Sequence, residues 1–358
     1  MIIYINHIHY NWLSQFSPSR LGFGDAAEVF IFLSGYASAL AYGRAFKKYG
    51  FKVGCRRVAS RCWDLYIAHL AIFFILVLIC LLGNQLFTSP NYIGRLNLWP
   101  LFKYPDQAIA GLLTLTYVPN YFDILPMYIV ALAMIPVVVY IGNIRPALVL
   151  LLCGGLYLTV WLSGFNLPAE FWSDRGWFFN PFCWQLVFFM GFAISIGWLT
   201  VPAVSGWLVA LCCLFLVASA WLCYGPAYTS AYWLEYVHDT LDPYRQKSTA
   251  GPLRWLHFLA MAYLAVVLLK GREVILHRNW ARPLVIAGQN SLPVFMTSLA
   301  MSYLAAMVLD RIGREPWTST LVSLGGAVLL VGSGYLFAWR KRRVATAKRV
   351  EAVAGGIA

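Results

Sequence analysis

The sequence predicts an all-α fold: a polytopic helical bundle in a membrane, with about ten transmembrane helices of which the first is truncated. Of the 358 residues, 61% are hydrophobic and only 11% are charged, and the mean hydropathy is +0.68. A water-soluble domain has about 25% charged residues, so this composition excludes that class. The expected partner is therefore the lipid bilayer. We expect no nucleic acid, because the cations cluster in short connections beside apolar runs.

A spanning helix needs roughly 20 mostly apolar residues. The segment Met1–His9 is shorter than that, and we interpret it as the remnant of a first helix. Full spans are expected at 26–42, 65–84, 125–141, 147–165, 182–199, 203–224, 254–269, 284–309 and 318–339. The apolar part of 104–126 is too short to span, so we expect a re-entrant or interfacial helix that ends at Pro119 and Asn120.

The distribution of cations predicts the orientation. Alternate connections, together with the tail, hold 18 of the 27 Lys and Arg residues but only 3 of the 14 acidic residues. By the positive-inside rule this face is cytoplasmic, and the C-terminus lies on it. We expect residues 1–342 to form one integral-membrane domain and residues 343–358 to form a basic cytoplasmic tail.

Two carboxylates, Asp25 and Glu28, stand at the start of the first full span. Ionisable groups at the edge of a spanning segment are costly, which makes them candidates for a functional site. The same spacing is also that of a capping box, in which both side chains satisfy backbone N–H groups at a helix start. One residue can serve both purposes. Further along this span, the four-residue spacing of Gly35, Ala39 and Gly43 predicts close helix packing.

Polar side chains inside or beside the other spans must find partners within the bundle or line a wet cavity. Tyr66 and His69 also fit polar anchors at the interface, and a lone buried histidine such as His257 is commonly structural. The sequence around Ser34 lacks the GxSxG pattern of a nucleophile elbow, and the cysteines lack metal-ligand spacing, so we expect no metal. The candidates for binding the acceptor or lining a cavity are Ser34, Tyr66, His69, Asp123, Asn180, Gln185, His257, Gln289, Asn290 and Ser291.

Six blocks, in order along nearly the whole chain, carry a family resemblance. They are FGDAAEVFIFLSGYASALAYG, CRRVASRCWDLYIAHL, YVPNYFDILPMYIVAL, FNPFCWQLVFFMG, LRWLHFLAMAYL and GQNSLPVF. This pattern resembles the OpgC family of bacterial inner-membrane acyltransferases and, more distantly, the type 3 membrane acyltransferases. The resemblance implies succinylation: transfer of a succinyl group to hydroxyls of osmoregulated periplasmic glucans. It further implies succinyl-CoA, or a similar acyl-CoA, as co-substrate and no bound cofactor.

The resemblance also implies site residues. The superfamily histidine in the outer half of the first helix matches His7, and an arginine eleven residues before it would fall upstream of Met1. We therefore expect either a start assigned too late or a truncated and inactive copy. In GQNSL, family members often have a basic residue or histidine between Gly288 and Ser291, which puts a direct role for Asn290 in doubt.

The proposed chemistry matches this layout. A sugar hydroxyl attacks a thioester only if a base takes its proton, which suits His7, and Asp25 or Glu28 could orient the imidazole. The phosphates of acyl-CoA would bind cations of the basic connection, although the positive-inside rule explains the same residues. These cations are Arg56, Arg57 and Arg61. Interrupted helices also serve transporters, so a translocator of a glycan or lipid-linked sugar is the alternative, beside an inactive subunit.

Overall fold

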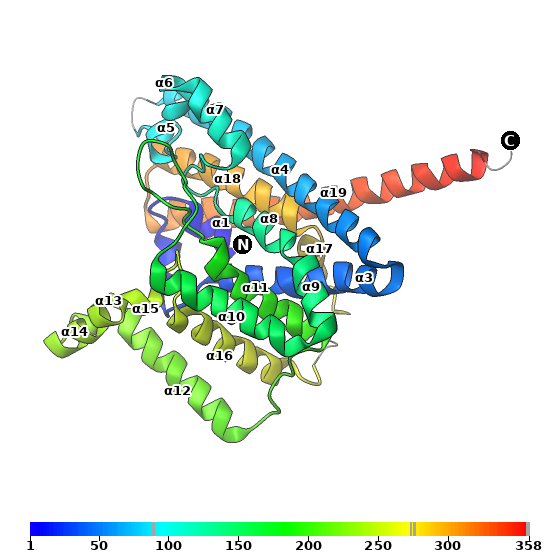
Figure 1. Ribbon diagram of the computed structural model, residues 1–358. Helices are drawn as coiled ribbons and strands as arrows, with labels where there is room; N and C mark the ends of the chain where they lie inside the picture. Colours follow the sequence, from blue (N-terminus) through cyan, green and yellow to red (C-terminus); the bar gives the residue numbers. More distant parts are fainter. Residues whose placement is uncertain (88–89, 273, 275–276, 356–358) are drawn as a thin grey trace. The chain divides into compact units, whose positions relative to one another are not determined.

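The computed structural model of the protein describes residues 1–87, 90–272, 274 and 277–355 (Figure 1). In that part of the chain the regular structure is helical, with one isolated β-bridge between Pro168 and Gly176 and no strand. Eight of the helices described there are long and apolar enough to cross a membrane, and a further apolar helix has 16 residues. The predicted polytopic helical bundle is confirmed.

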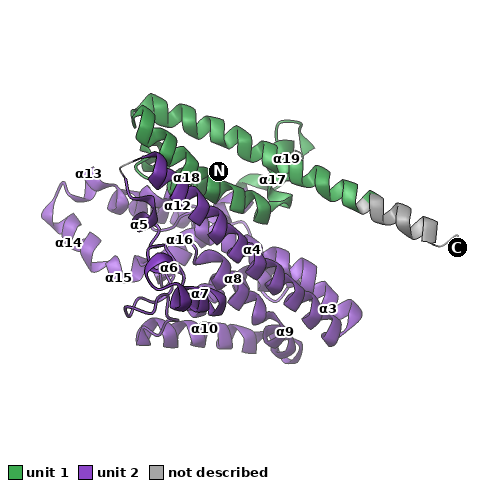
Figure 2. Cartoon of the chain, turned by 90° about the horizontal axis from the view of Figure 1, so that it is seen from above, with its two compact units in different colours: residues 1–17, 268–358 green, residues 18–267 purple. Residues whose placement is uncertain are grey.

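The chain divides into two compact units (Figure 2). Unit 1 joins Met1–Ser17 to Leu268–Ala358, and unit 2 is Pro18–Val267. The helices of unit 1 are α1 (Ile2–His7), η1 (Trp12–Phe16), α17 (Arg282–Gln289), α18 (Ser291–Ile312) and α19 (Pro316–Gly355).

The main helices of unit 2 are α2 (Ala26–Ser38), α4 (Phe51–Leu86), α8 (Ile124–Ala133), α9 (Ile135–Ile144), α10 (Pro146–Ser163), α11 (Pro181–Ile196), α12 (Gly206–Cys223) and α16 (Pro252–Leu269), whose last two residues fall in unit 1. Short helices connect them: η2 (Pro18–Arg20), η3 (Ala39–Gly43), α3 (Arg44–Tyr49), α5 (Tyr92–Arg95), α6 (Pro100–Lys103), α7 (Pro105–Thr114), α13 (Gly225–Tyr228), α14 (Tyr232–Thr240) and α15 (Asp242–Arg245).

In unit 1 the first residues of the chain are fixed against α18 and α19. Tyr4 is buried, and its hydroxyl donates to the carbonyl oxygen of Val322 at 3.3 Å. Its ring occupies space that a side chain at Gly326 would fill. Asn11 adds a hydrogen bond from Nδ2 to Ser323 Oγ at 2.9 Å. The segment before Pro18 therefore packs as part of this unit.

In unit 2 the closest helix pair is α2 with α11. A Cβ added to Gly35 would collide with the carbonyl of Phe188, and one added to Gly191 would collide with the carbonyl of Phe32. Backbones approach this closely only where side chains are absent, as in small-residue packing of membrane helices. The predicted packing role of Gly35 is confirmed.

The first full span is not a uniform α-helix. Helix α2 continues through the π-helical turn η3 into α3, so the span runs from Ala26 to Tyr49. Just before this turn, Ser38 Oγ lies 3.4 Å from the hydroxyl oxygen of Tyr128 on α8. Such π turns are rare and often occur at functional sites.

The structure defines the ends of the helices in segments 104–126 and 284–309. Helix α7 ends at Thr114, not at Pro119 and Asn120, so that prediction is wrong. The reason is local: Leu115 takes a left-handed conformation (φ 60°), after which the N–H of Tyr117 donates to the carbonyl of Gly111 and closes the helix. The span expected at 284–309 is divided at Asn290, because α17 ends at Gln289 and α18 starts at Ser291.

The α2–α11 contact predicts a difference between two glycine substitutions. Gly35→Ala should lower the Tm of the detergent-solubilised protein, because its methyl group meets the Phe188 backbone. Gly154→Ala on α10 is the matched control, since a Cβ there meets nothing within 4 Å. Alanine favours an open helical site by up to about 1 kcal/mol, so the control should match or exceed the wild type. Equal Tm values for both variants would contradict this packing.

Candidate functional site

The start of α2 is closed by a capping box. Asp25 Oδ1 accepts a hydrogen bond from the N–H of Ala27 at 2.7 Å, and Glu28 Oε2 accepts one from the N–H of Asp25 at 2.7 Å. This confirms the capping interpretation of the two carboxylates. Each carboxylate still has a second oxygen, and these oxygens face cations from distant parts of the chain.

Arg254, in the first turn of α16, reaches both carboxylates. Its Nε and Nη2 each lie 2.7 Å from Glu28 Oε1, and Nη2 lies 3.3 Å from Asp25 Oδ2. Lys247, just before α16, places Nζ 2.6 Å from Asp25 Oδ2. We refer to Asp25, Glu28, Lys247 and Arg254 as the charged junction.

The charged junction is largely shielded from solvent. Glu28 is fully buried, Asp25 and Arg254 nearly so, and the Lys247 side chain remains about one-third exposed at 32%. Burial alone would raise the pKa of Asp25, but the charges of Lys247 and Arg254 outweigh it and lower that pKa to about 2. Asp25 is therefore ionised at neutral pH and serves as an ion-pair partner, not as a proton carrier.

His257 packs against the charged junction, one turn after Arg254. Its side chain is 4% exposed, and its ring lies over the backbone of Gly22 and Gly24, where a Cβ would clash with the imidazole. Phe23 and Phe215 flank the ring, each with centroids 6.3 Å away. Within the described residues, Nδ1 of His257 has no hydrogen-bond partner. It is thus a buried histidine close to Arg254 of the charged junction.

His7, the predicted base, belongs to unit 1, whereas Asp25 and Glu28 belong to unit 2. His7 is half-buried at the end of α1, and its Nδ1 lies 2.7 Å from the carbonyl oxygen of Ile3. A carbonyl only accepts, so Nδ1 carries the proton and the lone pair of the neutral ring is on Nε2. A proton on Nδ1 is the arrangement that a base acting through Nε2 requires. Its pairing with either carboxylate stays a prediction.

The three predicted donor-binding cations differ in setting. Arg56 and Arg57 are exposed on the first turns of α4, and the Arg57 guanidinium lies 4.7 Å from the centre of the Tyr49 ring. Arg61, one turn further, is half-buried and close enough to interact electrostatically with Tyr42 and Tyr128. Of these three cations, Arg61 is therefore the one that extends toward the interior of unit 2.

Further polar side chains lie inside unit 2, on α2, α4 and α8. The hydroxyl groups of Tyr128 and Ser38 share a hydrogen bond and Ser34 lies close to Tyr128, so α8 and α2 are joined through hydroxyl groups. On α4, the hydroxyl of Tyr66 donates to the carbonyl of Leu113 at 2.8 Å. His69 is fully buried, and among the described residues neither of its ring nitrogens has a hydrogen-bond partner.

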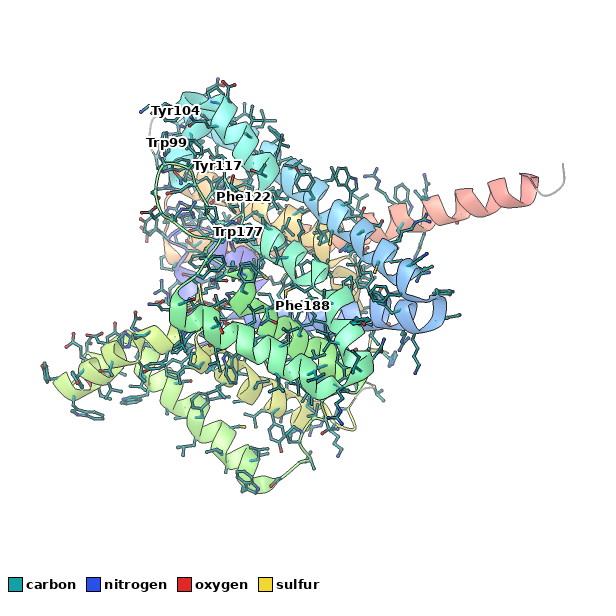
Figure 3. The ribbon with its side chains drawn as sticks, in the orientation of Figure 1. Trp99, Tyr104, Tyr117, Phe122, Trp177 and Phe188 are labelled. Carbon is teal, nitrogen blue, oxygen red and sulfur yellow. The ribbon has the colours of Figure 1, made fainter. Side chains whose placement is uncertain are left out.

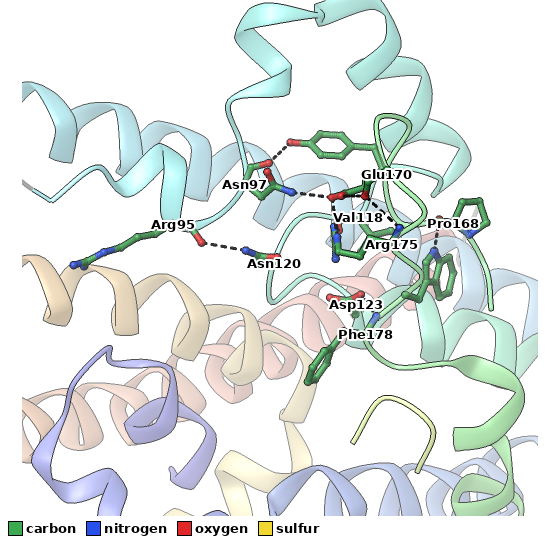
Figure 4. Close-up of polar contacts among 12 residues, drawn as sticks. Arg95, Asn97, Val118, Asn120, Asp123, Pro168, Glu170, Arg175 and Phe178 are labelled. Atoms are coloured by element: carbon green, nitrogen blue, oxygen red, sulfur yellow. Dashed lines mark hydrogen bonds and ion pairs between the residues drawn. The ribbon is translucent and has the colours of Figure 1, made fainter. Parts of the chain in front are cut away.

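Three predicted cavity residues are bound to backbone groups. Asp123 Oδ1 accepts from the N–H of Phe178 at 2.7 Å (Figure 4), and burial raises its pKa to about 6 against the opposing effects of this bond and of Arg175. Asn180 caps α11 and donates to the carbonyl of Phe165 at 2.6 Å. Gln185 Nε2 donates to the carbonyl of Cys153 at 2.7 Å. Their roles toward an acceptor stay predictions.

The residues at the break between α17 and α18 are less enclosed than expected. Gln289 and Ser291 are exposed, and Asn290 is half-buried. Asn290 Nδ2 donates to the carbonyl of Ile286 at 2.9 Å, which terminates α17. These contacts give the break a structural explanation. A contribution of the three residues to acceptor binding remains untested.

Sequence reasoning missed Arg254 and Lys247. Arg254 had a usable signal, since a cation in the opening turn of an apolar span is costly without a partner. Lys247 had none, because it lies in a loop whose path the sequence does not reveal.

Against known proteins, the family model described as OpgC protein matches residues 1–342. The chain belongs to the OpgC family. Membership of the OpgC family, with the apolar helices, indicates a multi-pass membrane protein with an acyltransferase-like role in glucan modification. No curated protein and no solved structure matches the chain.

The charged junction predicts unequal costs for its two cations. Arg254→Met leaves Glu28 buried without its partner and should cost about 3–5 kcal/mol of unfolding free energy. Lys247→Met removes a partly exposed pair and should cost about 1 kcal/mol or less. Denaturant unfolding of the purified variants in detergent measures both. Equal losses of unfolding free energy in the two variants would show that the cost of removing each cation does not depend on how deeply its ion pair is buried.

The lowered pKa of Asp25 predicts an acid dependence. With a folded pKa of about 2 against a reference of 3.8, the ionised Asp25 stabilises the fold fully above the reference pKa. This contribution falls as the pH drops toward 2, because the native carboxylate then takes up its proton. The stability gap between wild type and Asp25→Asn should thus be constant above about pH 5 and narrow below it. A gap that widens in acid would contradict the assignment.

Proposed function

We propose that this protein transfers a succinyl or similar acyl group from acyl-CoA to hydroxyl groups of a periplasmic glucan. The observation that carries this proposal is the match to the OpgC family over residues 1–342. The protein would lie in the bacterial inner membrane with its C-terminus in the cytoplasm. The acyl donor would come from the cytoplasm and the glucan from the periplasm.

In the proposed step, His7 is the general base. A glucan hydroxyl gives its proton to Nε2 of His7 while its oxygen attacks the thioester carbonyl. The carbon–sulfur bond breaks, the coenzyme A thiolate leaves, and the imidazolium returns a proton to it. The products are a glucan ester and free coenzyme A. The hydrogen bond from Nδ1 to Ile3 supports this role, because it places the lone pair on Nε2.

The acyl donor would bind at the start of α4. Arg56 and Arg57 are exposed there and suit the phosphates of coenzyme A, with Arg61 placed further along toward Tyr42 and Tyr128. Helix α4 has 36 residues and is about 54 Å long. Its cationic start and the connections after Leu86 therefore lie at opposite ends of unit 2.

In this proposal Asp25 and Glu28 have a structural role: they hold the start of α2 in place. Their carboxylates are held by Lys247 and Arg254, which fixes the start of α2 against α16. Orientation of the His7 imidazole by either carboxylate remains part of the proposal that only mutagenesis can test.

The test is acyl transfer by His7→Ala. This variant should lose about 10²–10⁴-fold in rate, the usual contribution of a general base. Anion-exchange chromatography of the glucans detects the reaction, because each succinyl group adds a carboxylate, and release of coenzyme A measures the rate. His277→Ala is the control, as His277 is an exposed histidine outside the proposed site.

Two outcomes would contradict the proposal. Normal acylation by His7→Ala at wild-type abundance would show that His7 is not the general base. Movement of unmodified glucan across vesicles, with no ester formed by the wild type, would favour the translocator instead.

A further inference from the structure

Four aromatic side chains form a continuous surface in unit 2, and we name Trp99, Tyr104, Phe171 and Trp172 the aromatic cap. The ring centroids of Trp99 and Trp172 are 5.1 Å apart, and those of Phe171 and Trp172 are 4.7 Å apart. Tyr104 completes the surface at 6.2 Å from Trp99 and 6.3 Å from Phe171. Figure 3 labels Trp99 and Tyr104 beside α6 and α7.

A polar network holds the two connections that carry the aromatic cap. Glu170 accepts hydrogen bonds from Asn97 Nδ2 at 2.9 Å and from Arg175 Nε at 2.7 Å (Figure 4). Arg175 Nη2 in turn donates to the carbonyl of Val118 at 2.8 Å. The hydroxyl of Tyr117 donates to the carbonyl of Asn97 at 2.7 Å. These bonds link residues 97, 117–118 and 170–175, so the rings are held in place before any ligand binds.

The aromatic cap lies in connections outside the apolar spans and beside exposed charged residues. None of its residues lies in the eight candidate spans found within the described residues. Tyr104 is 40% exposed and Phe171 is 39% exposed, and the adjacent charged residues are exposed as well. They are Lys103, Asp106 and Asp174. The exposed charges at this rim favour a ligand that approaches from water.

We propose that the aromatic cap binds the glucan acceptor, an inference that rests on the proposed function. Aromatic faces carry negative potential, and the C–H groups on the flat face of a sugar ring are weakly positive, so the two stack. The hydroxyl groups at the sugar's edge then meet the carboxylates of Asp106 and Asp174, which fix its orientation. Lys103 Nζ lies over the rings, 5.8 Å from the centre of Trp99 and 5.2 Å from that of Tyr104, so the sugar would meet this ammonium at those two faces. A rim of both charge signs suits a neutral polyhydroxyl ligand better than an ion.

The position of the aromatic cap matches this role. It follows the C-terminal end of α4, whereas the proposed donor cations stand at the start of that helix. The chain turns at Gly50 between α3 and α4, so the start of α2 lies at the same end of unit 2 as the aromatic cap. The glucan would therefore be held at the end of unit 2 opposite the acyl donor. The aromatic cap would supply binding to a polymer and not chemistry at the reacting hydroxyl.

The experiment compares wild type with the double variant Tyr104→Ala/Phe171→Ala. Both side chains are exposed, so their removal should leave the Tm close to that of the wild type. Coenzyme A release at varied concentrations of unmodified glucan gives KM and kcat. We expect the KM for glucan to rise by about tenfold, with a smaller effect on kcat. Trp233→Ala is the matched control, since Trp233 is an exposed aromatic residue on α14 outside the aromatic cap.

Calorimetric titration with the same glucan, without acyl donor, tests binding separately from chemistry. Cap-dependent glucan binding without any acyl transfer by the wild type would contradict the proposed function but support this inference. Acyl transfer with unchanged KM and affinity in the double variant would overturn the inference alone. Unchanged glucan affinity with weakened binding to phosphatidylglycerol vesicles would assign the aromatic cap to the lipid headgroups and overturn it as well.

Discussion

A carboxylate buried at the end of a membrane-spanning helix has to be paired, and this constraint organises one end of unit 2. Glu28 is fully buried and would be prohibitively costly there without Arg254. The pair joins the start of α2 to α16, more than two hundred residues later. Lys247, in the loop before α16, pairs with Asp25 and so joins this loop to the start of α2 as well. Because α2 also packs tightly on α11, the charged junction and the glycine contacts together fix the direction of this helix.

Much of the fold could be predicted from hydropathy. Long apolar runs need a bilayer, and most predicted spans correspond to helices of the structure, with ends displaced where the helix continues into polar sequence, as in α4. The span predicted at 284–309 is divided between α17 and α18. The spacing of Gly35 and Gly43 predicted packing, and that of Asp25 and Glu28 predicted a capping box. These features could be predicted because the residue spacing that indicates each of them lies within one helix.

The candidate site was harder to predict, since its contacts join segments that are distant in the sequence. Nothing in the local sequence of Lys247 indicates that Asp25 is its partner. Asp123 and Asn180 were predicted to line a cavity, yet their partners are backbone groups of a connection that follows an irregular path. His7 and Asp25 lie 18 residues apart in the sequence but in different compact units, a division that composition does not reveal.

The π-helical turn Ala39–Gly43 has a consequence for helix phase. Over the eight residues from Gly35 to Gly43, a regular α-helix would rotate the second glycine about 80° away from the first. The extra residue taken up by a π turn reduces this offset to about 20°. Both glycines therefore face α11, with Gly35 against Phe188 and Gly43 against Ile196. The turn thus has the properties of a one-residue insertion that the helix absorbed without losing its packing face.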